Sequence, residues 1–151
     1  MSSLIDLDIP KTWKFVRTIR TSVEQALEHF PEELRYAAGM AASELVGNAI
    51  KYGEIPPPPH LTCSVDDKQI VIEVSNRVAS EESALDAQRR IAQANAGHGE
   101  SLFLGRLQEL LMGAGEGGQL GLYRICYEGA FDLSYRYVDK ILTITAVRGL
   151  T

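Results

Sequence analysis

The sequence predicts an α+β fold, a two-layer sandwich in which a mixed, mostly antiparallel sheet is covered on one face by helices. Segments of alternating apolar and polar residues come in pairs joined by short polar turns, which is typical of hairpins. Segments with helical periodicity are grouped rather than strictly alternating with strands. The 151 residues contain no internal repeat and no dividing linker, so we expect a single domain over residues 1–151.

The N-terminal third is expected to form one strand and two helices. Leu4–Pro10 alternates and predicts an edge strand, because Pro10 limits further sheet pairing. Val16–Phe30 carries its apolar residues on one helical face, which predicts a helix. A second helix opens with Pro31 in its first turn and runs to about Tyr52, where Gly53 is placed to end it. The apolar face of the first helix, expected to be core or a homodimer face, contains Val16, Ile19, Val23 and Leu27.

Two hairpins follow in the rest of the chain. After a proline-rich connector, Leu61–Val65 and Gln69–Ser75 alternate on either side of a short acidic turn. Phe131–Val138 and Lys140–Val147 form the closing pair, with the turn at Asp139. Both pairs place one set of apolar side chains on a common face, so each predicts a half-buried antiparallel hairpin.

The segment between the hairpins begins with a polar stretch, Asn76–His98. Its Ser83–Ala94 portion predicts a helix with a weak apolar stripe of Leu85 and Ile91, typical of a loosely attached cover. Another helix is indicated by leucines over residues 103–111, and a further buried helix by Leu120–Glu128. A glycine-rich run separates these last two helices.

Composition excludes several functional classes. The net charge of −5, with no basic stripe, argues against nucleic acid as a partner. No apolar run is long enough for a membrane span and Met1–Asp8 has no signal core, so we expect a soluble, cytoplasmic protein. Cys63 and Cys126 sit in apolar contexts far apart, which favours reduced packing residues. The three histidines lack zinc-ligand spacing.

A polar pair on the second helix is the main candidate for chemistry. Glu44 and Asn48 stand four residues apart and therefore share one face, with Lys51 and Tyr52 one turn further on. The residues between them are apolar and mostly small, so this helix can lie close to a sheet. Unpartnered polar groups on such a helix would cost a few kcal/mol. The pair is typical either of a solvated helix edge with a satisfied asparagine or of a functional site.

The glycine-rich run is the second candidate. Gly113, Gly115 and Gly118 match G-x-G-x-x-G, but the run follows a helix rather than the strand that a Rossmann fingerprint requires. No G-K-[ST] follows, which excludes a Walker P-loop. Two interpretations remain: a phosphate cradle formed by free amides at a helix start, or a flexible turn between core helices.

In chain order these features resemble the GHKL (Bergerat-fold) ATPases, whose domain is the histidine-kinase-like ATPase fold. The run Glu44-Leu-Val-Gly-Asn-Ala-Ile-Lys-Tyr52 resembles their N-box, and Gly117-Gly-Gln-Leu-Gly-Leu122 resembles their second glycine box. The likeness is closest to the anti-sigma-factor serine kinases of bacterial partner-switching systems and the related SiaB-type kinases. The order of helices, hairpins, lid and glycine box also matches, over nearly the whole chain.

The resemblance implies ATP and Mg²⁺ as cofactors and assigns a role to each matching residue. Asn48 would bind Mg²⁺ through its carboxamide oxygen. Glu44 would orient or deprotonate the attacking hydroxyl as general base. Lys51 would reach a phosphate as a point charge. The amides expected to meet the phosphates belong to Gly117, Gly118, Leu120 and Gly121.

The adenine-binding element departs from the family pattern. The family has D-x-G-x-G after a strand, whereas this chain reads Val74-Ser-Asn-Arg-Val78, with Asn76 at the aspartate position and Val78 at a glycine position. Asn76 keeps an acceptor oxygen but loses its charge, worth about 1 kcal/mol or more. Val78 hinders a positive φ and a close approach to the base. We therefore expect weaker nucleotide binding than in the family.

Three hypotheses follow from this pattern. The first is a serine/threonine kinase that phosphorylates a small antagonist (STAS-like) protein with Mg·ATP, with a sigma factor or other regulator as a further partner. The second is a binding module on the same fold that sequesters a protein partner with weak or no nucleotide binding. The third is a structural domain unrelated to the family. A homodimer is expected from the resemblance only.

Overall fold

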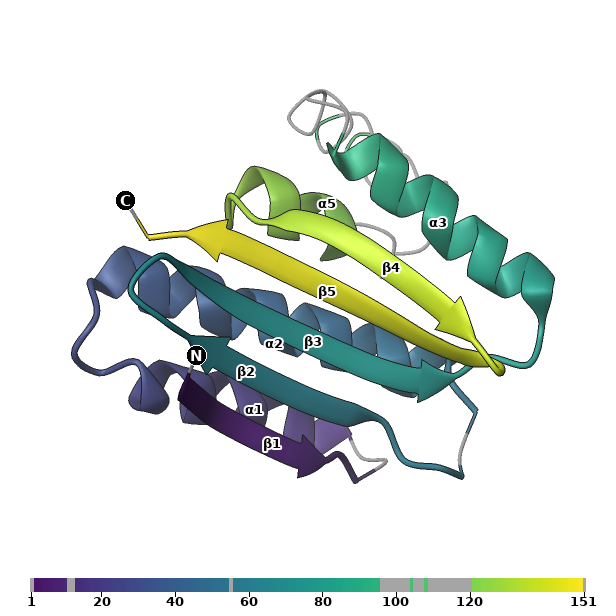
Figure 1. Cartoon of the computed structure of the whole chain (residues 1–151), viewed down its shortest axis with the longest axis horizontal. Helices are drawn as coiled ribbons and strands as arrows, with labels where there is room; N and C mark the ends of the chain where they lie inside the picture. The colour runs from purple at the N-terminus through teal and green to yellow at the C-terminus, as the bar shows by residue number, and fades with distance from the viewer. Residues whose placement is uncertain are drawn as a thin grey trace.

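The structure is a computed structural model that describes residues 2–10, 13–54, 56–95, 104, 108 and 121–150. Its elements follow the predicted order, with strands and helices grouped (Figure 1). They are β1 (Ser2–Asp8), α1 (Trp13–Ala26), α2 (Glu32–Tyr52), β2 (His60–Val65), β3 (Gln69–Arg77), α3 (Glu81–Asn95), α5 (Gly121–Tyr127), β4 (Asp132–Val138) and β5 (Ile141–Gly149).

The strands form one five-stranded sheet in the order β1-β2-β3-β5-β4. Every pairing between neighbouring described strands is antiparallel, so this sheet has no parallel pair. The α+β prediction is confirmed, and β1 lies at an edge as expected. Asp139 and Lys140, in the β4–β5 turn, both have positive φ, 53° and 65°. Two consecutive positive φ values are the signature of a type I′ hairpin turn, whose twist suits the flanking strands.

Helices α1, α2 and α5 lie on one face of the sheet, as predicted, and α3 runs along the edge strand β4 (Figure 1). The buried side chains of α1 and α2 meet those of the central strands in one apolar core. On α1, Ile19 and Val23 are buried in this core and Val16 packs against it. Leu27, directly after the helix, is also buried there, so the predicted apolar face is core within the chain. Helix α1 begins and ends earlier than predicted, at Trp13 and Ala26.

Helix α2 is the central element, and its end depends on one close approach. Gly53 ends α2 in an extended conformation, with φ −80° and ψ 158°, rather than in the left-handed region. A Cβ atom at Gly53 would lie 2.4 Å from the Ala49 carbonyl oxygen and 2.6 Å from Asn76 Nδ2. Glycine is therefore needed here because the end of α2 passes directly over the end of β3.

Helix α3 is tied to the rest of the fold more firmly than its sequence indicated. The Asn95 carboxamide exchanges two hydrogen bonds with the backbone N–H and C=O of Leu133 in β4. Tyr123 Oη in α5 donates to Gln93 Oε1 at 3.0 Å. The predicted stripe was wrong at Leu85, which is 57% exposed. The buried face instead consists of Ala84, Ile91 and Ala94.

Two further predictions concern segments that the structure describes only in part. In the helix predicted over residues 103–111, Leu104 and Gln108 are described and both are helical. Most of the glycine-rich run lies outside the described residues. Among the helices of the described ranges, none is long and apolar enough to cross a bilayer.

Candidate functional site

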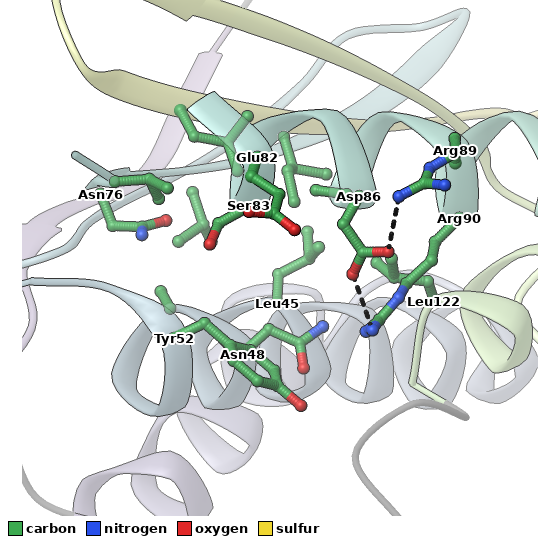
Figure 2. A pocket seen from close by; sticks show the side chains of 16 residues that line it. Leu45, Asn48, Tyr52, Asn76, Glu82, Ser83, Asp86, Arg89, Arg90 and Leu122 are labelled. Carbon is green, nitrogen blue, oxygen red and sulfur yellow. Dashed lines mark ion pairs between the residues drawn. The ribbon is translucent and has the colours of Figure 1, made fainter. Parts of the chain in front are cut away.

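A cavity of about 370 Å³ lies between α2, the strands β3 and β5, and α3 (Figure 2). Small-molecule sites have volumes of about 300–1,000 Å³, so this one is large enough to hold a ligand. Its walls are largely apolar, and polar groups enter from α2, β3 and α3. The apolar lining comes from Leu45, Ala49, Val74, Val78, Ala87, Leu122, Leu142 and Ile144.

Asn48 enters the cavity from the α2 side. It stands one turn after Glu44 on a helix whose buried residues are mostly small, which lets the helix lie close to the sheet. Figure 2 shows its carboxamide pointing into the cavity. Its carboxamide makes no hydrogen bond to any other residue that the structure describes. An amide oxygen without a protein partner is free to bind a ligand or a hard cation.

Asn76 enters from the sheet, near the end of β3. It is one of the few buried polar residues of the described chain, at 7% exposed. Its Nδ2 atom donates only a long hydrogen bond, 3.5 Å, to the Arg77 carbonyl oxygen, so most of its hydrogen-bonding capacity is unused. Because Asn76 lines the cavity, water or a ligand there can use the remaining hydrogen-bonding capacity of its carboxamide.

Glu44 does not line the cavity and is held by α5. Its Oε1 atom accepts a hydrogen bond from Arg124 Nη1 at 3.0 Å, and Arg124 also pairs with Glu128 at 3.2 Å. Gly121 touches the other oxygen, since a Cβ atom there would lie 2.5 Å from Glu44 Oε2. Burial raises the pKa of Glu44 above its ordinary value, while the Arg124 guanidinium opposes this rise.

Lys51 is exposed and is not among the residues that line the cavity. Its ammonium lies 5.1 Å from the centre of the Tyr52 ring, a cation–π distance. Tyr52 itself does line the cavity. The structure therefore brings Asn48 and Asn76 together and leaves Lys51 at the periphery, where its phosphate role stays a prediction.

The predicted phosphate amides are described only in part. Gly117, Gly118 and Leu120 lie outside the described residues. Gly121 is the first residue of α5, and Leu122 beside it lines the cavity. The end of the glycine box is thus adjacent to the cavity.

Sequence reasoning missed the charged wall that α3 gives the cavity. Glu82, Asp86, Arg89 and Arg90 all line it. The Asp86–Arg90 spacing of four residues signals a helical ion pair, but such pairs usually lie on solvated faces. Only the docking of α3 against β4 and α5 turns this face toward α2.

The side chains of the cavity fit the cofactors implied by the sequence, ATP and Mg²⁺, only in part. Among the described residues, no group of three His, Cys, Asp or Glu side chains could hold a metal ion. Asn48 alone would supply a protein oxygen, which suits a Mg²⁺ ion that keeps its waters and is held mainly by substrate phosphates.

No protein-family model matches the chain, and no curated protein matches it significantly. The assignment of function therefore rests on the residues of the cavity and on the motifs that they belong to.

Proposed function

We propose that this protein is a GHKL-type ATP-binding regulator that uses Mg·ATP to phosphorylate a serine or threonine of a small antagonist protein. The observation that supports this proposal is the cavity shared by Asn48 and Asn76. These two residues belong to separate motifs of the chain, and both present unsatisfied carboxamides to the same space. Each carboxamide therefore keeps hydrogen-bonding capacity for a ligand in the cavity, and the two reach it from separate elements of the fold.

Each residue has a defined task under this proposal. Asn76 accepts a hydrogen bond from the amino group of the base at the sheet end of the cavity. Asn48, on α2, would hold Mg²⁺ through its carboxamide oxygen, and the ion would neutralise phosphate charge. The amides of Gly117, Gly118, Leu120 and Gly121 would meet the phosphates.

Glu44 would receive the proton of the attacking hydroxyl. The hydroxyl oxygen forms a bond to the γ-phosphorus, the bond from that phosphorus to the β-phosphate oxygen breaks, and ADP leaves. Arg124 holds Glu44 Oε1 at 3.0 Å and lowers the pKa of Glu44, so release of this partner would make the carboxylate a stronger base. Its raised pKa favours proton uptake once it is released.

A second function is favoured by a specific pair of residues. Asn76 is uncharged and Val78 is buried, where the family has aspartate and glycine. A domain of this kind would bind nucleotide weakly or not at all and would act by sequestering a protein partner.

Calorimetric titration with Mg·ATP separates the two functions. The kinase predicts one binding site, with Asn48→Ala weakening ATP about tenfold or more in Mg²⁺ and much less in EDTA. Gln25→Ala is the matched control, because it removes a carboxamide from an exposed position on α1. Identical heats for wild type and Asn48→Ala would exclude the magnesium role, and no heat from the wild type would favour the sequestering module.

Phosphoryl transfer is tested separately. Incubation with Mg·ATP and candidate antagonist proteins should give a phosphoprotein and ADP with wild type, and neither with Glu44→Gln. Nucleotide binding without either product would leave a nucleotide-dependent binding protein and exclude the kinase.

A further inference from the structure

The α3 wall of the cavity includes the guanidinium of Arg90, which no motif of the sequence indicates. Arg90, on α3, is only 24% exposed, whereas its neighbour Arg89 is 72% exposed. Arg90 Nη2 lies 2.8 Å from Asp86 Oδ2, and Asp86 is its one charged partner in the described chain. A guanidinium on a solvated helix face is normally well exposed, whereas the low exposure of Arg90 goes with its place in the cavity wall.

Arg90 lies at a particular end of this cavity. Figure 2 shows its side chain extending from α3 toward α2, at the end occupied by Asn48 and Leu122 and away from Asn76. Leu122 follows Gly121 at the start of α5, so this is the end nearest the glycine box. A ligand whose base meets Asn76 would place its charged end here.

The charged residues of α3 that line the cavity account for the ion pair between Arg90 and Asp86. Glu82 and Asp86 balance Arg89 and Arg90, so the α3 wall has no net charge. Asp86 also lies 3.5 Å from Arg89 Nη2, which spreads its charge over two guanidinium groups. Asp86 has 43% of its side chain exposed, so it can turn to water if Arg90 finds another anion. Solvent at the exposed carboxylate weakens this ion pair, so a phosphate in bidentate contact with Arg90 can replace Asp86.

We propose that Arg90 is a phosphate-binding residue of this cavity and that Asp86 holds it in place until a ligand phosphate takes over the guanidinium. This inference deepens the proposed function and rests on it. It identifies α3 as the element that recognises the charged part of the nucleotide, with Asn76 serving the base at the other end.

Titration of Mg·ATP, adenosine and tripolyphosphate into three variants tests the inference. Arg90→Gln should weaken ATP and tripolyphosphate roughly tenfold or more and leave adenosine within about twofold, because only the phosphates lose a partner. Asp86→Asn should tighten ATP by roughly threefold or more, since it removes the competing carboxylate. Arg17→Gln is the matched control, because it removes a guanidinium from an exposed position on α1 that does not line the cavity, and it should leave all three ligands within about twofold.

Each of the other outcomes contradicts either the phosphate role of Arg90 or the proposed nucleotide function. If ATP binds wild type and Arg90→Gln equally, or if adenosine weakens as much as ATP, Arg90 is not a phosphate contact and the proposed function stands. If wild type binds tripolyphosphate through Arg90 but not ATP, the phosphate site stands and the nucleotide function fails. If wild type binds none of the three ligands, both fail.

Discussion

Breaking the ion pair between Glu44 and Arg124 should destabilise the protein in a pH-dependent way. The two charged atoms are 3.0 Å apart, which at an effective dielectric constant of about 20 corresponds to about 5.5 kcal/mol of direct attraction. The side chains are 27% and 29% exposed, and Arg124 retains Glu128 as a partner, so solvent screening and desolvation reduce the net value. We expect a net coupling of about 2 kcal/mol, as for a hydrogen bond to a charged group.

The direction of the pH dependence follows from the raised pKa of Glu44. The folded state binds the Glu44 proton more tightly than the unfolded chain, so stability falls as pH rises from the ordinary value of 4.5 through the higher folded value. Arg124→Gln removes the cation that opposes this rise, so the pKa of Glu44 climbs further. The stability deficit of the variant should therefore be largest at pH 7 and shrink toward pH 4.

A double-mutant cycle measures this coupling. Urea unfolding of wild type, Arg124→Gln, Glu44→Gln and the double variant gives the interaction free energy at pH 7 and at pH 4. A coupling below about 0.5 kcal/mol at pH 7, or one that is equal at the two pH values, would refute the reasoning. Either result would mean that Arg124 does not restrain Glu44, and the proposed release step would be unnecessary.

Three further predictions concern the scaffold around the site. His60 is hydrogen-bonded to Asp8 at 2.7 Å, and this contact is the main cause that raises the pKa of His60 above 6.5. The contribution of the contact to folding stability is therefore full below pH 6.5 and is lost as the pH rises through the folded-state pKa. An NMR titration of His60 should show a lower midpoint in Asp8→Asn. Gly53→Ala should cost about 2 kcal/mol in urea unfolding, because its Cβ atom would meet the Ala49 carbonyl oxygen at 2.4 Å, and a loss under about 0.5 kcal/mol would contradict that contact. Lys140→Gly should stabilise the protein by about 1 kcal/mol by relieving the positive φ of 65°, and a lower unfolding midpoint would contradict this account.

The sequence predicted the elements whose periodicity is strong and local. Both hairpins and α2 agree closely with expectation, because alternation over six to nine residues and a helix between Pro31 and Gly53 leave few other structures. Helix α3 was placed correctly but its buried face was not. Leu85 is the larger apolar side chain, yet the face that contacts β4 and α5 admits small residues such as Ala84 and Ala94. Periodicity records only the apolar residues of one element, and the shape of the surface opposite them decides which are buried.

The residues of the candidate site also fall into two groups, those that sequence motifs predicted and those that they did not. Asn48 and Asn76 could be found from motifs, since each motif sits at a fixed place in its own element. Arg90 could not, because its burial depends on how Asn95 ties α3 to Leu133, a contact between distant parts of the chain. The ion pair of Glu44 with Arg124 was equally hidden, since it joins α2 to α5.

Under the proposed function, Asn76 and Val78 would affect nucleotide binding through different physical quantities. Val78 is buried and forms part of the cavity wall, and a cavity of about 370 Å³ remains beside it, so valine has not filled the space that a base would occupy. Its backbone also keeps an ordinary φ, because among the described non-glycine residues positive φ occurs only at Ala130, Asp139 and Lys140. As a nucleotide site of the proposed kind, the cavity would therefore lack charge at Asn76 rather than room. Asn76→Asp should restore that charge, and the sign of its effect on ATP affinity reports whether the base donates to this side chain.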